Sequence, residues 1–246
     1  MKKNIKKFML LVFCILFSFT LCACSSHKKE YTAITKAQEN IINLSSGKFI
    51  ITSSYDKPEK ANTIKTEFIF NKNSDGTLSY CQTQYDKNDK PVCCKFSDGK
   101  TTEQWLIGKG WETVEAPAFT ADNPHQYISV LTEIIPNKYI SSIAVNNEQE
   151  NTVYTVDINS KNINKHKYND SDLSISSETV KFILSSEGEL NEYEDVASVK
   201  DTKSESDCIY TLNIKLVEKD NNPTITKPDL KSPVFSNKKT NEKKSS

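Results

Sequence analysis

Arginine is absent from this sequence, and all 32 of its basic residues are lysines. Because Arg is the usual bidentate partner of guanine edges and phosphate groups, its absence argues against specific nucleic-acid recognition. The 32 Asp and Glu residues cancel the lysines over the whole chain, so we do not expect a basic surface that steers nucleic acid either.

Motifs of catalysis and metal binding are also missing. The sequence has no GxSxG, HExxH, P-loop or GxGxxG motif, no CxxC pair and no Cys/His cluster at zinc spacing. His27, His125 and His166 stand far apart in the sequence, and we expect each to be a solvated residue rather than a ligand or a base. The sequence therefore predicts no enzymatic activity, no cofactor and no metal.

The N-terminus has the pattern of a secretion signal. Residues 1–7 carry four lysines and no acid, and residues 8–21 are an uncharged apolar run. That run is too short to span about 30 Å of hydrocarbon, whereas its length suits the apolar region of a signal peptide.

The next residues, Leu21-Cys22-Ala23-Cys24, resemble the lipobox of bacterial lipoproteins. By that resemblance, residues 1–23 are removed and Cys24 receives a diacylglyceryl anchor of palmitate type, which holds the protein on the extracytoplasmic face of the cell membrane. Two acyl chains are enough for durable attachment. Cleavage before Cys22 would place Leu21 where a small residue is required, and an uncleaved membrane anchor is the other alternative.

Four cysteines remain for the folded body: Cys81, Cys93, Cys94 and Cys208. Four cysteines allow three pairings, and the sequence does not choose between them. Cys93 and Cys94 are neighbours, so in a strand they would point to opposite faces. We expect buried thiols or one disulfide.

Hydrophobic periodicity predicts a helix followed by a sheet. Residues 29–44 place apolar side chains three and four positions apart, which is typical of an amphipathic helix. The period then becomes two, which predicts strands at 48–55, 63–70, 78–85, 92–96 and 101–114. Short loops join these segments, so we expect an antiparallel meander.

A second helix is predicted to begin at Asn123, with Pro124 at its first position, and to end at Pro136. Strand-like segments then resume at 139–145, 151–158, 179–186, 190–199 and 208–218. The final stretch, 219–246, is rich in Pro, Asn, Lys and Ser without any period, which predicts a disordered tail. The expected layout is a signal peptide (1–23), an anchor linker (24–28), one folded domain (29–218) and this tail.

This layout resembles the LolA/LolB-like lipoprotein-carrier fold, and the best local match is KFSDGKTTEQWLIGKGWETV, residues 95–114. The resemblance implies an α+β, mostly antiparallel protein: a curved half-barrel of about ten strands with two main helices on its concave face. Carrier members use an Arg to contact lipoprotein cargo, and this chain has none, which argues against lipoprotein transport. The Lys- and Asn-rich composition is typical of an AT-rich, Gram-positive anaerobe, which would have no outer membrane.

Aromatic residues at positions expected to face inward are the candidate binding site. In a half-barrel they would line a cleft for an acyl chain or another apolar ligand, whereas in a flat sandwich they would simply be core. Polar strand edges also allow pairing with a partner chain, including a homodimer formed by strand exchange. The cleft candidates are Phe68, Phe70, Tyr80, Phe96, Trp105, Trp111 and Tyr210.

Two functions fit these predictions. The first is an accessory factor for a cell-wall hydrolase, because architecture and composition are similar to a LolA-like germination lipoprotein of clostridia that assists the amidase of spore-cortex peptidoglycan. That resemblance implies a protein partner, and a place at the cell membrane or spore envelope of a Gram-positive spore former during sporulation and germination. The alternative is a carrier or sensor of a lipid or other apolar ligand.

The neutral total charge conceals an uneven distribution. Residues 24–218 carry 21 Lys against 29 Asp and Glu, a balance of −8, while the segment 219–246 carries seven Lys against three acids. We therefore expect repulsion between the body and anionic membrane or wall polymers, and contact between the tail and those polymers.

Overall fold

A computed structural model describes residues 27–56, 62–115, 128–159, 161, 173–201 and 207–231. The predicted signal peptide and Cys24 lie outside these residues, as do His125, His166 and the end of the predicted tail. The chain divides into two compact units, one formed by residues up to Asn43 with Val130–Tyr210, and the other by Leu44–Ser129 with residues from Thr211 onward.

The helical elements are α2 (Lys28–Ile42), α3 (Ser129–Thr132) and the short 3-10 helix η2 (Asn137–Tyr139). The strands of the second unit are β1 (Ser46–Asp56), β2 (Asn62–Lys72), β3 (Leu78–Tyr85), β4 (Pro91–Ser97), β5 (Thr102–Leu106) and β6 (Gly110–Thr113). Those of the first unit are β7 (Ile140–Glu148), β8 (Asn151–Ile158), β9 (Leu173–Ser185) and β10 (Leu190–Asp201), and β11 (Asp207–Lys219) contributes to both.

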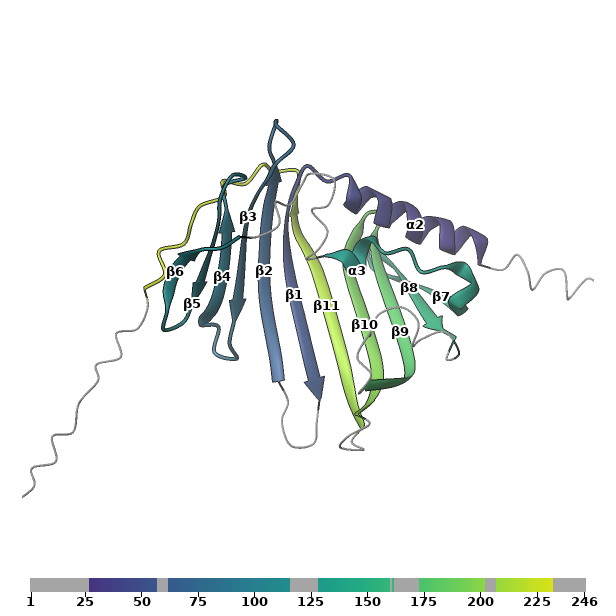
Figure 1. The fold of residues 1–246 in the computed structure, drawn as a ribbon. Helices are drawn as coiled ribbons and strands as arrows, with labels where there is room; N and C mark the ends of the chain where they lie inside the picture. Colours follow the sequence, from purple (N-terminus) through teal and green to yellow (C-terminus); the bar gives the residue numbers. More distant parts are fainter. Residues whose placement is uncertain are drawn as a thin grey trace, which may run out of the picture. The chain divides into compact units, whose positions relative to one another are not determined.

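The described strands form one sheet in the order β6-β5-β4-β3-β2-β1-β11-β10-β9-β8-β7 (Figure 1). Neighbours such as β2 and β3, or β9 and β10, pair antiparallel, which confirms the predicted mostly antiparallel meander. The described residues form eleven strands rather than about ten, because residues 101–114 form a hairpin of two strands, β5 and β6. Gly108 and Gly110 have positive φ angles of 82° and 88° at its turn, as expected of a hairpin there. The half-barrel curvature stays a prediction.

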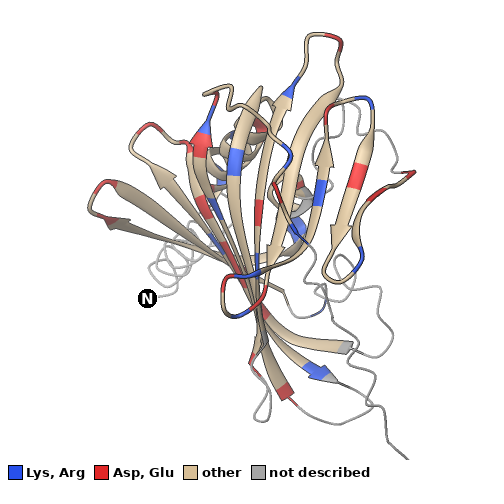
Figure 2. Cartoon of the chain, turned by 90° about the vertical axis from the view of Figure 1, so that its left-hand side faces the viewer, with Lys and Arg blue, Asp and Glu red and all other residues tan. Residues whose placement is uncertain are grey.

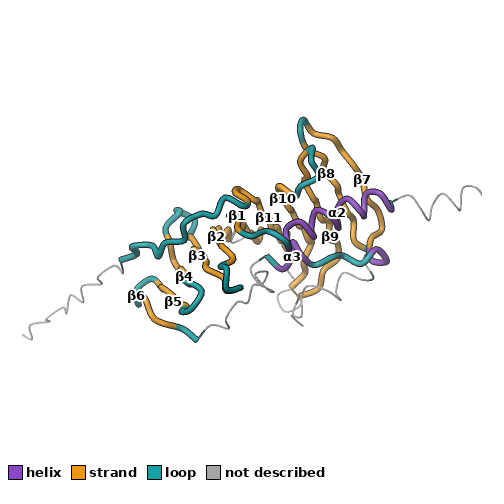
Figure 3. Tube along the Cα trace, turned by 90° about the horizontal axis from the view of Figure 1, so that it is seen from above, coloured by secondary structure: helices purple, strands orange, loops and turns teal. Residues whose placement is uncertain are grey.

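The predicted first helix is confirmed as α2, which packs on β10 and β7 of its unit. Its buried side chains are Ile34, Ala37, Gln38 and Ile41, which lie at helical spacing on one face. In Figure 3, which is seen from above, α2 runs across the region of β8 and β9 in its unit. Within the part of the chain that the structure describes, no helix has the length and hydropathy to cross a membrane.

The prediction of two main helices is wrong, because α3 is a single turn in the described chain. Its sequence is rich in β-branched residues, which are weak helix formers. Ile135 also precedes Pro136, and the proline ring disfavours helical backbone at the residue before it. Leu131 is nevertheless 2% exposed, so the turn is fixed by burial rather than by helix propensity.

The second unit has an aromatic core over β1, β2 and β3. Phe49 lies directly opposite Phe68 in the β1–β2 ladder, and Phe70 lies opposite Tyr80 in the β2–β3 ladder. The ring centroids of Phe68 and Phe70 are 5.7 Å apart, and those of Phe68 and Tyr80 are 6.1 Å apart. Such pairs contribute about 0.5–1.5 kcal/mol each beyond the area that they bury.

The start of the predicted disordered tail has a defined position in the second unit. The backbone N–H of Asp220 donates to the carbonyl of Ser46 at 3.0 Å, and that of Asn222 donates to the Ser46 hydroxyl at 3.1 Å. The side-chain amide of Asn71 donates to the carbonyl of Pro223. Figure 1 shows this segment continuing past the ends of β1–β5 toward β6. We call residues 220–231 the C-terminal segment. Because these residues have a defined position, the prediction of a disordered tail remains only for residues 232–246.

Charged side chains are interspersed along the strands of each unit (Figure 2). Several form cross-strand pairs, such as Lys48 Nζ to Glu67 Oε2 at 3.3 Å and Lys181 Nζ to Glu194 Oε1 at 2.6 Å. These pairs are partly exposed, so each contributes at most about 1 kcal/mol.

The Asp98-Gly99 turn between β4 and β5 follows the sequence prediction. The Asp98 carboxylate accepts hydrogen bonds from the backbone N–H groups of Thr101 and Lys100, both at 2.8 Å, and these bonds lower its pKa. Gly99 has a φ of +93°, and a Cβ there would lie 2.5 Å from Asn73 Nδ2 and 2.6 Å from Thr77 Oγ1. The turn therefore requires glycine for its conformation and for space.

Replacing Gly99 by Ala should destabilise the protein by roughly 2–4 kcal/mol, because backbone strain and steric overlap add. Gly76→Ala is the matched control, since Gly76 has a φ of +80° but no atom within 4 Å of the added Cβ. It should cost only about 1 kcal/mol from the backbone alone. Urea unfolding measures both values, and equal losses would contradict the steric argument.

Candidate functional site

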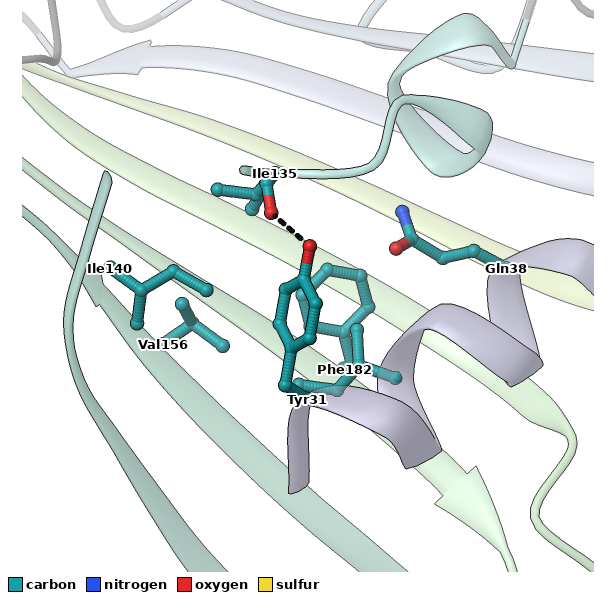
Figure 4. Close-up of a pocket in the computed structure, with 7 residues that line it drawn as sticks. Tyr31, Gln38, Ile135, Ile140, Val156 and Phe182 are labelled. Atoms are coloured by element: carbon teal, nitrogen blue, oxygen red, sulfur yellow. Dashed lines mark hydrogen bonds between the residues drawn. The ribbon is translucent and has the colours of Figure 1, made fainter. Parts of the chain in front are cut away.

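A small hollow lies between α2 and the strands of the first unit. It is lined by Tyr31, Ile34, Gln38, Ile135, Ile140, Val156 and Phe182 (Figure 4). The space that a water-sized sphere can occupy inside it is about 10 Å³, within about 200 Å³ of empty space that includes open solvent. Its walls are mostly apolar, because the helix and the strands turn their hydrophobic faces toward each other.

The floor of this hollow consists of strand side chains. Val156 of β8 and Phe182 of β9 are each 1% exposed. The ring of Phe182 meets the ring of Tyr193 on β10 edge to face, with centroids 5.4 Å apart. This contact fixes the floor, since edge-to-face packing is a preferred arrangement of aromatic rings.

The cover of the hollow is residues 131–135, which we call the cover segment. Gln38 Nε2 donates to the carbonyl oxygens of Leu131 and Glu133, at 2.9 and 3.1 Å. Tyr31 donates its hydroxyl hydrogen to the carbonyl of Ile135 at 3.0 Å, the bond dashed in Figure 4. These carbonyls lie in the α3 turn or just after it, where no helical N–H group is available to donate to them. Gln38 and Tyr31 of α2 supply the missing hydrogen-bond donors.

This arrangement suits binding of an apolar molecule rather than catalysis. The polar atoms at the rim are already engaged with backbone carbonyls, and the walls offer dispersion contacts and a dry surface. Within the described ranges, no three His, Cys, Asp or Glu side chains gather where they could hold a metal ion.

The seven predicted cleft residues do not share one face. Side chains alternate across a strand, so the ladders decide which face each residue takes. Phe68, Phe70 and Tyr80 belong to the aromatic core on one face of the second unit. Phe96 lies opposite Cys81, the neighbour of Tyr80, and therefore takes the other face.

Trp105 and Trp111 share that second face with Phe96. Trp105 lies opposite Cys94 in the β4–β5 ladder and opposite Trp111 in the β5–β6 ladder. Phe96 and Trp111 pack against the buried cluster of Cys81, Cys94 and Trp105. The prediction that the aromatic candidates mostly share one inward face is therefore wrong. A difference of one position along a strand moves a side chain to the opposite face of the sheet.

The C-terminal segment covers this second face. Ile225 and Leu230 pack against the cluster that contains Trp105. Lys227 Nζ lies 4.5 Å from the ring centroid of Trp111 and 2.6 Å from Glu103 Oε1, so it makes a cation–π contact and an ion pair. The two tryptophans are thus covered by the chain itself.

Tyr210 belongs to the first unit, whereas the other six aromatic candidates belong to the second. It is half-buried and packs against a cluster of Ile175, Ala197, Val199 and Cys208. None of the seven candidates lines the hollow under α2.

The strand aromatics do not indicate the residues that line the hollow. Gln38 had a signal in the sequence: it lies four positions after Ile34 and one turn before Ile41, on the apolar stripe of α2. A polar residue on an apolar stripe needs a hydrogen-bond partner when buried, and Gln38 is 1% exposed.

Comparison with known proteins leaves the family open. No protein-family model matches the sequence, and no curated protein is significantly similar to it. LprF from Mycobacterium bovis is 12% identical, with 81% of this chain and 97% of that chain covered and a TM-score of 0.46. A LolA superfamily protein from Nitrosomonas europaea is 8% identical (76% and 93% covered, TM-score 0.28). A MucA/MucB complex of Pseudomonas aeruginosa gives 14% identity, with 74% and 55% covered and a TM-score of 0.27. At these identities and TM-scores the LolA-like assignment stays a prediction.

Replacing Gln38 by Leu should loosen the cover segment while keeping the volume of the side chain. Loss of both hydrogen bonds should destabilise the protein by roughly 1–3 kcal/mol and speed amide hydrogen exchange over residues 131–135. The control is Thr35→Val, because the Thr35 hydroxyl is exposed and bonds only the nearby Thr32 carbonyl. Equal exchange in both variants would show that Gln38 does not hold the cover.

Proposed function

We propose that this protein binds an apolar ligand beneath α2, on the outer side of a membrane to which Cys24 anchors it. The observation that supports this proposal is the small, mostly apolar hollow under α2, covered by a segment that side-chain hydrogen bonds hold to α2. This site agrees with the alternative function predicted from the sequence, a carrier or sensor of a lipid or other apolar ligand.

The hollow must enlarge to hold a lipid chain. Ligand pockets usually measure about 300–1,000 Å³. The hollow under α2 has only about 10 Å³ that a water-sized sphere can occupy, so it is nearly filled by its own side chains. Enlargement requires the cover segment to move, which breaks the two bonds of Gln38 and the one bond of Tyr31. At a net value of about 1 kcal/mol per hydrogen bond, this opening costs about 3 kcal/mol.

An acyl chain offers enough free energy to offset that cost. Each methylene group buried from water contributes about 0.8 kcal/mol, so about four buried methylenes balance the three lost bonds. Longer chains leave a surplus for binding, while short polar molecules do not. The site therefore favours ligands with an extended hydrocarbon part, such as a lipid.

The absence of Arg narrows the ligand class further. Lipoprotein cargo transport is not part of the proposal, because the cargo-contacting Arg of the resembled carriers has no counterpart in this sequence. The accessory role at a cell-wall or spore-cortex hydrolase stays a prediction from resemblance. Whether the purified protein carries lipid distinguishes that role from ligand binding.

Protein purified from cell membranes should release lipid into organic solvent and bind a fluorescent fatty acid such as cis-parinaric acid. Ile140→Trp should fill the hollow and weaken binding of this probe at least tenfold, because half-buried Ile140 lines it. Ile209→Trp is the matched control, since Ile209 is 48% exposed in the same unit. Thermal unfolding checks that both variants are folded.

Wild-type protein that carries no lipid and binds no probe would reject the ligand proposal. Co-purification of a wall hydrolase with such lipid-free protein would favour the accessory role instead. Equal loss of probe binding in the Ile140 and Ile209 variants would show that the probe does not bind under α2.

Replacement of Cys24 by Ser should release the protein from the membrane fraction, because Ser cannot carry the thioether-linked lipid. Metabolic labelling with a palmitate analogue should label the wild type but not this variant. Cys22→Ser is the control and should stay lipidated, and membrane retention of the Cys24 variant would reject the anchor.

A further inference from the structure

Two cysteine side chains touch inside the second unit. Cys81 of β3 and Cys94 of β4 have their sulfur atoms 3.7 Å apart. The residues are 7% and 0% exposed, respectively. Thr83 Oγ1 lies 3.5 Å from the Cys94 sulfur and 3.8 Å from the Cys81 sulfur, so one hydroxyl contacts both thiols.

The strand register explains why these two thiols meet. Cys94 lies opposite Thr83 and Cys81 lies opposite Phe96, so the two cysteines are diagonal neighbours on one face. The ladder shifts register between Gln84 and Tyr85, next to this pair. Such a shift increases the local twist of the strands, and twist brings one set of diagonal neighbours closer together.

The other two cysteines are placed differently. Cys93 is the neighbour of Cys94 and therefore points to the opposite face of β4. Cys208 belongs to a separate buried cluster in the first unit, with Ile175, Ala197 and Val199. Among the three pairings that the sequence allows, the one that joins Cys81 to Cys94 has its sulfur atoms already in contact.

We propose that Cys81 and Cys94 are a redox pair that forms an intrachain disulfide between β3 and β4 after export, while Cys93 and Cys208 stay thiols. The two sulfur atoms must approach from 3.7 Å to the bonding distance of about 2.05 Å. The bond closes the hairpin beneath Trp105, on the face that the C-terminal segment covers.

The oxidation balances by thiol–disulfide exchange with an external disulfide, either a protein or a small molecule. The Cys81 thiolate attacks that disulfide, forming a mixed disulfide and releasing one thiolate. Cys94, as thiolate, then attacks the Cys81 sulfur and releases the second. The two cysteines lose two protons and two electrons, and the external disulfide gains them as two thiols.

Cys81 is the better first nucleophile of the two. A hydrogen bond from the Cys94 thiol lowers the pKa of Cys81, whereas the same bond and burial raise the pKa of Cys94. Because both thiols are buried, exchange must occur before Ile225 and Leu230 pack over the pair. The cysteine pair lies in the second unit, whereas the hollow under α2 lies in the first.

Thiol counting on the exported protein tests the proposal. Cells are lysed in denaturant with a maleimide that blocks free thiols, and the membrane protein is digested without reduction. We expect maleimide on Cys93 and Cys208, and a linked peptide pair that contains Cys81 and Cys94. Reduction before labelling should give four modified cysteines.

Matched variants assign the bond. Cys93→Ala should keep the linked pair and lose one labelled thiol, whereas Cys94→Ala should abolish the link and leave three labelled thiols. Four labelled thiols in unreduced wild type, or a link to Cys93 or Cys208, would overturn the proposal.

Tryptophan fluorescence gives a second readout, because the two tryptophans of the chain, Trp105 and Trp111, both pack at this cluster. A disulfide quenches a neighbouring indole, so wild type that is unfolded, reduced and refolded under reducing conditions should emit more strongly than wild type refolded with its bond intact. Cys94→Ala should emit equally after the two treatments. Equal emission of the two wild-type samples would speak against the bond.

Discussion

Side chains alternate between the two faces of every strand, and in this protein both faces of the β1–β6 region carry apolar residues. Each face therefore needs its own cover. On one face the rings of Phe49, Phe68, Phe70 and Tyr80 pack together. On the other, Trp105 and Trp111 are covered by Ile225, Lys227 and Leu230 of the C-terminal segment, which places that segment despite its polar composition.

The first unit meets the same constraint with a helix. The apolar stripe of α2 packs over the strand face that contains Val156 and Phe182, and the stripe includes one buried amide, Gln38. A buried amide without a partner would cost about 1–3 kcal/mol, so it binds the carbonyls of Leu131 and Glu133. The same two hydrogen bonds hold the cover segment over the hollow. They therefore satisfy the buried amide and close the site at once.

Much of the local structure could be predicted because it depends on periods within one segment. The helix over 29–44 and the meander of strands follow from spacing and turn residues, and both are present as α2 and β1–β11. The second main helix was predicted wrongly, because apolar spacing favoured it while its β-branched residues and Pro136 disfavour helical backbone. The site was also missed: the aromatic residues separate into three places, since Tyr80 and Cys81 differ by one position and face opposite ways.

The sequence by itself determined the kinds of element and the order in which they follow one another, because periodicity, turn glycines and prolines act over a few residues. The predicted export signal and lipid anchor likewise depend only on neighbouring residues. Only the tertiary structure decided which faces are covered, that Gln38 and Tyr31 of α2 close a hollow with a segment about 100 residues away, and that Cys81 meets Cys94. Those outcomes depend on strand register and on long-range packing, which no single segment encodes.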